Sequence, residues 1–373
     1  MPRLILLFCL GFISAPAARA QPRPREPIDG AIDRGLNYLR QVQNHDGSWN
    51  AEAGFGQFGR IRGMGGAGNG DPAITALAVM AFLSAGRVPG EGADGKTVER
   101  GIRFVMSRQQ KGRPFSQSVT GGGTEMYYHG ICTLMLAEAA GMTEGKIADE
   151  LKLRIEDAVN VILRGQRKNP GPDVGGWRYQ MNGTDADLSV TGWQLMALRA
   201  AKNIGCDVPA ERIQAAVDYI NRCHDPFTGG FRYTTRGQVT VPCTGTGILA
   251  LELCGKEFHQ TAASLKAGNF ILNNPLQPGM AHFFYGIYYT SQGMFQLGQN
   301  YWKNYRPKLH ELLLRSNPPQ QNGAWYGNGF DDARYGPTYC TPMAILALTV
   351  EYRLLPIYQR FEEPKERDGT DKE

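Results

Sequence analysis

One two-part unit recurs along the chain, and it restricts the fold more than any other feature of the sequence. Each unit has an amphipathic segment, a loop with glycine and an aromatic residue, and a second segment rich in small apolar residues. In the first copy, Leu36 and Leu39 belong to one apolar stripe, which predicts a helix buried on one face. The second segment, from Pro72 onward, is apolar over most of its circumference. It therefore predicts a helix buried on nearly every side.

Six copies of the unit are present, and six helical hairpins can bend round until the first meets the last. The copies lie near residues 32–86, 98–143, 151–204, 212–255, 265–300 and 309–355. An open array of hairpins, which is the alternative, needs polar caps at its ends, but the terminal copies are no more polar than the central ones. We predict an all-α chain with one α/α toroid (an α6/α6 barrel) over residues 21–361. Its apolar helices lie inside, and their ends surround a central cavity.

The two ends of the chain do not fit the repeat. Residues 1–20 contain basic Arg3, then an apolar stretch, then small residues at Ala18 and Ala20, which is typical of a secretory signal peptide. We expect cleavage before Gln21 and export to the periplasm or the extracellular space. No later stretch approaches the roughly 18 apolar residues of a membrane helix, so no transmembrane segment is expected in the mature chain. Residues 362–373 are predicted to form a disordered, charged tail.

Composition excludes some classes of function. A net charge of +5 over 373 residues is too small and too dispersed for a nucleic-acid-binding surface. Six cysteines remain after Cys9 of the leader, and an even number permits disulfides, although a large core does not need them. Residues 63–68 match the pattern G-x-G-x-x-G, but no strand precedes them. We therefore expect no dinucleotide and no other cofactor.

The first and third copies resemble a known family. Residues 34–49, with Gln43 and an Asp-Gly-x-Trp loop that ends at Trp49, are similar to the glutamine–tryptophan repeat of squalene-hopene and oxidosqualene cyclases. In that family the glutamine side chain and the tryptophan ring tie the outer helix to its loop. The resemblance thus implies a terpene cyclase-like toroid, related also to the protein prenyltransferases.

The third copy carries the residues that the resemblance makes catalytic. Residues 185–189 resemble the Asp-x-Asp-Asp-Thr motif of these cyclases, whose middle aspartic acid protonates an alkene or an epoxide. By this resemblance Asp187 is the acid and Asp185 supports it. Leu188 stands in place of the last aspartate and Ser189 in place of threonine. The alternative is that Asp187 caps the helix that follows, because Asp before an apolar helical run is an ordinary N-cap signal.

Aromatic residues gather near the predicted inner helix ends, where ring faces can stabilise a carbocation. The residues expected to bind substrate are His129, Tyr128, Trp193, Phe284, Tyr285, Tyr289 and Tyr339. Further aromatic residues near these ends are Tyr127, Phe283, Tyr288 and Tyr335. The alternative is that these side chains belong to the core, since aromatic residues at helical spacing commonly do.

Zinc is a second candidate chemistry, because protein prenyltransferases share the toroid and bind zinc through Asp, Cys and His. Cys243, Cys340 and His129 stand at inner helix ends and are the zinc candidates. Val241 occupies the place of the prenyltransferase aspartate, and zinc needs three or four ligands. The alternative is that all three are packed residues of the rim.

The function implied by the resemblance is acid-initiated isomerisation or cyclisation of an isoprenoid in a central, aromatic-lined cavity. Such an enzyme is an intramolecular transferase or isomerase without a cofactor. A non-catalytic toroid that binds an apolar ligand or a protein partner is the main alternative, and zinc-dependent prenyl transfer is the third. Neither the ligand nor the oligomeric state follows from the sequence.

Overall fold

The computed structural model describes residues 26–51, 70–116 and 123–359. In these residues the chain is helical, and its extended contacts are limited to isolated β-bridges. The predicted signal peptide, the predicted tail and the glycine pattern at 63–68 lie outside the described residues.

Twelve helices form the six predicted hairpins. The outer helices are α1 (Pro27–Val42), α3 (Gly95–Ser107), α5 (Lys146–Gly165), α7 (Ala210–Cys223), α9 (Ala262–Asn273) and α11 (Gln299–Glu311). The inner helices are α2 (Pro72–Ser84), α4 (Glu125–Ala140), α6 (Leu188–Asn203), α8 (Val241–Leu253), α10 (Phe283–Leu297) and α13 (Pro337–Leu348). A short helix, α12 (Phe330–Tyr335), precedes α13, and a π-turn, η2 (Leu312–Ser316), continues α11.

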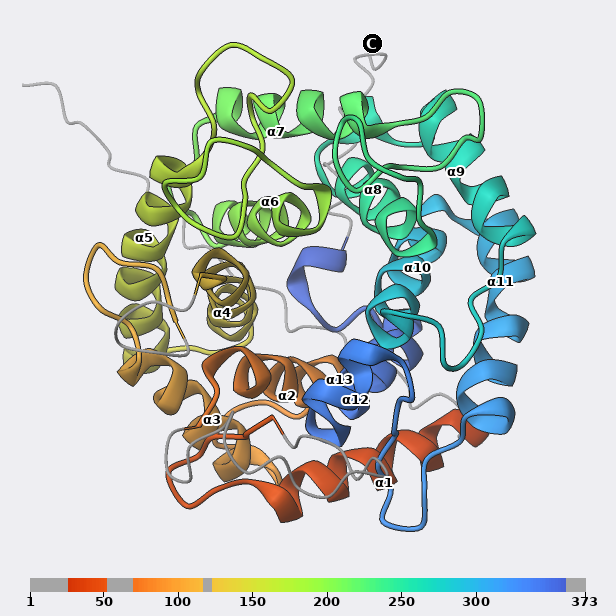
Figure 1. Ribbon diagram of the computed structural model, residues 1–373. Helices are drawn as coiled ribbons and strands as arrows, with labels where there is room; N and C mark the ends of the chain where they lie inside the picture. The colour runs from red at the N-terminus through yellow and green to blue at the C-terminus, as the bar shows by residue number, and fades with distance from the viewer. Residues whose placement is uncertain (1–25, 52–69, 117–122, 360–373) are drawn as a thin grey trace, which may run out of the picture.

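The inner helices form a closed ring. Each contacts the next, and α13 contacts α2, so the last hairpin meets the first. Figure 1 shows this ring surrounded by the outer helices. Every residue of α2 is buried, whereas α1 buries one face. The α/α toroid predicted from the repeat is confirmed.

Glutamine and tryptophan side chains fasten α1 to its loop, as the resemblance implies. Trp49 Nε1 donates to the Leu39 carbonyl at 2.8 Å. Gln43 Nε2 donates to the Gly47 carbonyl in its own loop and to the Thr97 carbonyl of α3, both at 2.9 Å. The glutamine therefore joins one repeat to the next.

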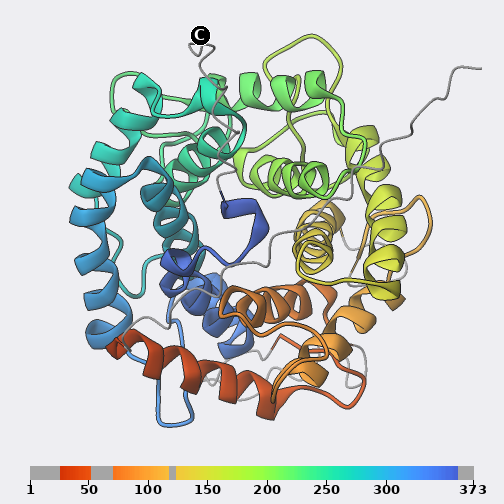
Figure 2. The ribbon, with the colours of Figure 1, turned by 180° about the vertical axis from the view of Figure 1, so that it is seen from behind.

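The segment after α13 folds back into the ring. It contains the short turns η3 (Val350–Tyr352) and η4 (Pro356–Tyr358), and η4 contacts α6. Seen from behind, this dark blue segment crosses the centre of the ring (Figure 2). The Ile357 N–H donates to both carboxylate oxygens of Glu138 at 3.2 Å, and the hydroxyls of Tyr358 and Tyr288 lie 2.7 Å apart. No pattern in the sequence predicted that the segment after α13 would fold back into the ring.

The six cysteines of the described part are all free and buried, so they belong to the core. No helix in the described ranges is long and apolar enough to cross a membrane.

Candidate functional site

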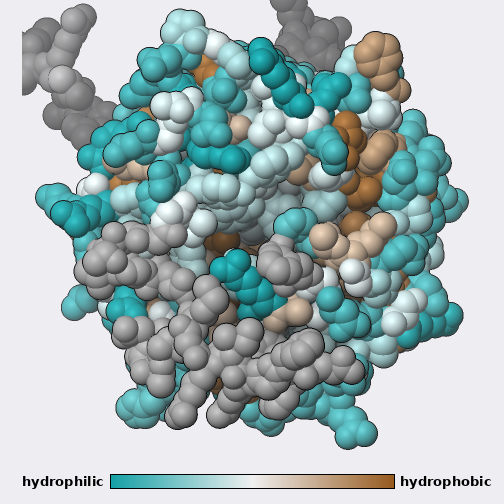
Figure 3. Space-filling view, in the orientation of Figure 1, coloured by the Kyte–Doolittle hydropathy of each residue, from teal (hydrophilic) through white to brown (hydrophobic). Residues whose placement is uncertain are grey.

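A cavity of about 280 Å³ lies where the inner helices begin. The space-filling view shows this face hollowed near its centre, with hydrophobic surface at the bottom of the hollow (Figure 3). The lining residues are Asp71, Ala73, Ile74, Leu77, Thr124, Tyr127, Tyr128, Ile131, Tyr179, Trp193, His282, Tyr285, Tyr335, Tyr339 and Met343. The described lining is thus apolar and rich in tyrosine, and it contains no Lys or Arg.

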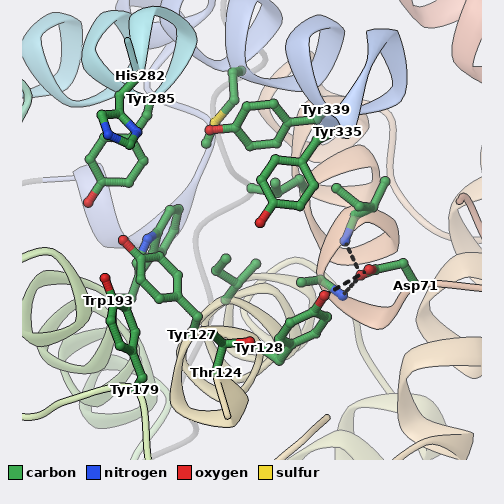
Figure 4. A pocket seen from close by; sticks show the side chains of 15 residues that line it. Asp71, Thr124, Tyr127, Tyr128, Tyr179, Trp193, His282, Tyr285, Tyr335 and Tyr339 are labelled. Atoms are coloured by element: carbon green, nitrogen blue, oxygen red, sulfur yellow. Dashed lines mark hydrogen bonds between the residues drawn. The ribbon is translucent and has the colours of Figure 1, made fainter. Parts of the chain in front are cut away.

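Contacts between rings hold the aromatic wall. Tyr127 of α4 stacks on Tyr179 with ring centroids 5.8 Å apart, and Tyr335 and Tyr339 lie 5.4 Å apart. Close-packed rings keep their orientation, so the wall is preorganised. Figure 4 shows these side chains around one space, contributed by several repeats.

Asp71 alone carries a carboxyl group among the described lining residues. It caps α2, with Oδ1 accepting from the backbone N–H groups of Ala73 and Ile74 at 2.9 and 3.0 Å. Its Oδ2 accepts from the Tyr128 hydroxyl at 3.0 Å (Figure 4). Burial raises the pKa of Asp71, and the three hydrogen bonds oppose this rise only in part. Asp71 is therefore a buried acid in an apolar, aromatic environment.

Asp71 was not among the site residues predicted from the sequence. A signal was present, because Asp71 stands four residues before Thr75, as Asp187 stands four before Thr191. Each threonine hydroxyl accepts a hydrogen bond from the backbone N–H of the tryptophan in its own repeat, at 3.0 Å. Asp71 and Asp187 are thus equivalent positions of two repeats.

Asp187 has the geometry of a helix cap. Its Oδ1 accepts from the Val190 N–H at 2.9 Å and from the Ser189 hydroxyl, and its Oδ2 accepts from Arg178 at 2.9 Å. It is fully buried but does not line the cavity. Burial raises its pKa, while the Ser189, Val190 and Arg178 contacts act in the opposite direction. Asp185 is exposed and pairs with Arg178 Nε at 3.1 Å. Their catalytic roles stay predictions.

His129 lies in the core instead of the cavity. Its Nδ1 accepts from the Phe115 N–H at 3.2 Å, so Nε2 carries the proton and donates to the Ala158 carbonyl at 2.9 Å. Burial lowers the pKa of His129 to about 4, which keeps the ring neutral at neutral pH. It takes the place that Thr75, Thr191, Thr244 and Thr341 hold in the first, third, fourth and sixth repeats, where each hydroxyl accepts from the backbone N–H of the loop aromatic residue.

The predicted aromatic residues divide into two groups. Those that line the cavity are Tyr128, Trp193, Tyr285 and Tyr339. Phe284 and Tyr289 are fully buried beside it, Phe284 against Phe283 and Tyr289 against Tyr285. Two lining residues, Tyr179 and His282, were not predicted, because the loops that carry them follow no helical period.

The zinc candidates do not converge. No group of three His, Cys, Asp or Glu side chains suited to a metal ion occurs within residues 26–51, 70–116 and 123–359. Cys243 and Cys340 are buried, and the Cys340 thiol donates to the Asp332 carbonyl at 3.6 Å.

Comparison with known proteins agrees with this architecture. Residues 20–133 match the model of the squalene-hopene cyclase C-terminal domain. A search of the curated proteins found no match. Among solved structures, an inactive variant of an α-1,6-mannanase of Salegentibacter has a TM-score of 0.63 at 10% identity, covering 86% of this chain and 99% of that chain.

Two further solved structures have different activities. Cellobiose 2-epimerase from Bacillus thermoamylovorans has a TM-score of 0.60 at 10% identity, covering 87% of this chain and 100% of that chain. A variant of the type II terpene cyclase MstE from Scytonema, in complex with geranylgeranyl dihydroxybenzoate, has a TM-score of 0.54 at 14% identity, with 88% and 97% covered. The described part of the chain is an α/α toroid, and proteins with this fold have several chemistries.

Proposed function

We propose that the chain is an exported enzyme that isomerises or cyclises a small isoprenoid in the tyrosine-lined cavity, with Asp71 as the acid. The observation that carries the proposal is the position of Asp71, a buried carboxyl on the cavity wall beside Tyr128. The family-model match over residues 20–133 supports the assignment, since that stretch contains both residues.

Protonation of a carbon–carbon double bond requires a carboxylic acid that is protonated in the free enzyme. Among the described lining residues no Lys or Arg occurs, so none of them pairs with the Asp71 carboxylate. By contrast, Arg178 pairs with Asp187 at 2.9 Å. Of these two equivalent aspartates, Asp71 is the one whose surroundings favour the protonated form.

The reaction begins when the Asp71 hydroxyl transfers its proton to one alkene carbon, or to an epoxide oxygen with opening of a C–O bond. For an alkene, the π electron pair forms the new C–H bond. For an epoxide, an oxygen lone pair forms the O–H bond, and the electron pair of the broken C–O bond stays on oxygen. In both cases a carbocation remains. Tyrosine and tryptophan faces stabilise this cation, while Tyr128 and two backbone N–H groups stabilise the carboxylate. Loss of a proton from a neighbouring carbon to that carboxylate completes an isomerisation.

The cavity volume limits the substrate. A volume of about 280 Å³ lies near the lower end of the range for ligand pockets, about 300 to 1,000 Å³. This favours a compact isoprenoid over a triterpene.

A deuterium experiment tests the proposal. Wild type and the Asp71→Asn and Asp187→Asn variants would be incubated in D2O with geraniol, geranylacetone and their terminal epoxides. We expect deuterium in the product of wild type and a loss of about 10²- to 10⁴-fold for Asp71→Asn. Equal rates for Asp71→Asn and wild type would refute Asp71 as the acid, and a selective loss in Asp187→Asn would favour the motif-based assignment.

A binding role is the second candidate, and one observation favours it. Two backbone N–H groups and Tyr128 donate to Asp71, and such donors favour the carboxylate over the acid. A carboxylate among tyrosine rings suits a ligand that is held without chemical change. Saturable binding of the same compounds, without product and without deuterium, would select this role.

Export is a separate part of the proposal and rests on residues 1–20. Expression of the full chain in a bacterium, followed by N-terminal sequencing, should give a mature protein that begins near Gln21. Recovery of the uncleaved chain from the cytoplasm alone would contradict export.

A further inference from the structure

Trp193 is fixed in the cavity wall by its neighbours. It lies on α6, is fully buried and lines the cavity. Its ring stacks on Tyr288 with centroids 5.5 Å apart and planes 6° apart, and it meets Tyr289 edge-on at 5.4 Å. These contacts hold the indole in one orientation.

The indole N–H of Trp193 has no hydrogen-bond acceptor among the residues that the structure describes. The chain has five tryptophans, and the other four all donate to an oxygen. Those four donate at 2.8 to 3.0 Å: Trp49 to Leu39, Trp177 to Ile162, Trp325 to Leu313 and Trp302 to Glu351. A buried donor without a partner costs about 1–3 kcal/mol, so Trp193 differs from its counterparts where a ligand would bind.

The charges around the cavity limit the acceptor that a ligand can present. An anionic group would meet the Asp71 carboxyl and, among the described lining residues, no Lys or Arg. Burial of an unpaired anion in such surroundings is strongly unfavourable. These surroundings therefore favour a neutral oxygen as the acceptor over a diphosphate or a carboxylate.

We propose that the ligand is an oxygenated apolar molecule, a ketone, alcohol, ether or epoxide, whose neutral oxygen accepts a hydrogen bond from Trp193 Nε1. This inference rests on the proposed use of the cavity and makes Trp193 a specificity-determining residue. Figure 4 shows Trp193 and Asp71 on opposite sides of the cavity, on α6 and before α2. When Trp193 binds the ligand oxygen, the remainder of the ligand therefore faces Asp71.

A pair of isosteric probes tests the inference by binding alone. Geranylacetone and its analogue with C=CH2 in place of C=O have nearly the same shape, and only the ketone can accept a hydrogen bond. Wild type should bind the ketone about 2- to 10-fold more tightly, as expected for one neutral hydrogen bond. Benzothienylalanine at position 193 keeps the ring but removes the N–H, and it should abolish the preference.

A spectroscopic measurement on wild type avoids any effect of substitution on folding. In ¹⁵N-labelled protein, the indole resonance of Trp193, assigned with Trp193→Phe, should move downfield with the ketone and stay within line width with the methylene analogue. Equal affinity for both probes, or a preference that survives loss of the N–H, would overturn the inference while cavity binding stands. If neither probe binds, the proposed use of the cavity falls, and this inference falls with it.

Discussion

Asp71 and Asp187 hold the same place in the first and third repeats but have different partners. Each donates its backbone N–H to the carbonyl of the repeat tryptophan, at 3.0 Å and 2.9 Å. The Oδ2 atom of Asp71 accepts from the Tyr128 hydroxyl, whereas Oδ2 of Asp187 accepts from the Arg178 guanidinium. One of the two equivalent positions therefore places its carboxyl group on the cavity wall, and the other is an ion-paired helix cap.

This difference predicts that two matched substitutions change the free energy of unfolding by different amounts. Asp187→Asn removes the buried one of the two carboxylates that pair with Arg178, and we expect the free energy of unfolding to fall by about 1–3 kcal/mol. Asp71→Asn keeps an equally good N-cap residue and should change it by less than about 1 kcal/mol. Urea denaturation of both variants at neutral pH measures this, and equal losses would contradict the distinction.

Glu138 should make stability fall as pH rises. Burial raises the pKa of Glu138 from 4.5 to about 8, so the folded chain holds a proton that the unfolded chain releases. The stabilisation is fully present below the unfolded pKa and is lost as pH rises through the folded value. Thermal unfolding between pH 4.5 and 8 should show wild type losing stability while Glu138→Gln, whose amide oxygen can still accept from Ile357, changes much less. If the stability of wild type and of Glu138→Gln changed with pH in the same way, Glu138 would be ruled out as the source of the pH dependence.

Gly245 permits the close approach of α8 and α10. A Cβ there would lie 2.7 Å from the Thr290 nitrogen and 2.8 Å from the Tyr289 carbonyl carbon, both backbone atoms. Gly245→Ala should therefore destabilise the chain by about 1–3 kcal/mol. The control is Gly30→Ala in α1, where a Cβ meets only the end of Arg34 at 3.7 Å, and where alanine should stabilise by about 0.5–1 kcal/mol. A neutral result at Gly245 in denaturant titration would refute the tight contact.

Gln166 should contribute to stability through two repeats at once. Its Nε2 donates to the Gly175 carbonyl at 3.0 Å and to the Arg212 carbonyl of α7 at 2.8 Å. Gln166→Ala leaves buried carbonyls without these donors, and we expect a loss of about 1–3 kcal/mol. Gln214→Ala, which removes an exposed bond to Asp218, should stay within about 0.5 kcal/mol. Calorimetry of the two variants compares them directly, and similar melting temperatures would contradict the prediction.

The repeat by itself determined the helices, their inner or outer position and the closure of the ring. This is possible because the spacing of apolar residues along one helix is a local property of the sequence. A helix must turn these residues toward the core. The Gln43 and Trp49 contacts were also predictable, because both residues bond to backbone groups of their own hairpin or the next one.

Tertiary structure decided which aspartate reaches the cavity and what surrounds it. Arg178 directly follows Trp177, whereas Asn50 follows Trp49, so of these two repeats the third places a guanidinium beside its cap. Tyr128 reaches Asp71 from the next hairpin, and the η4 turn reaches Glu138 from more than two hundred residues away. A periodic sequence specifies which face of each helix is buried. Which side chains meet across the ring depends on neighbouring hairpins, because those contacts are made only when the toroid has closed.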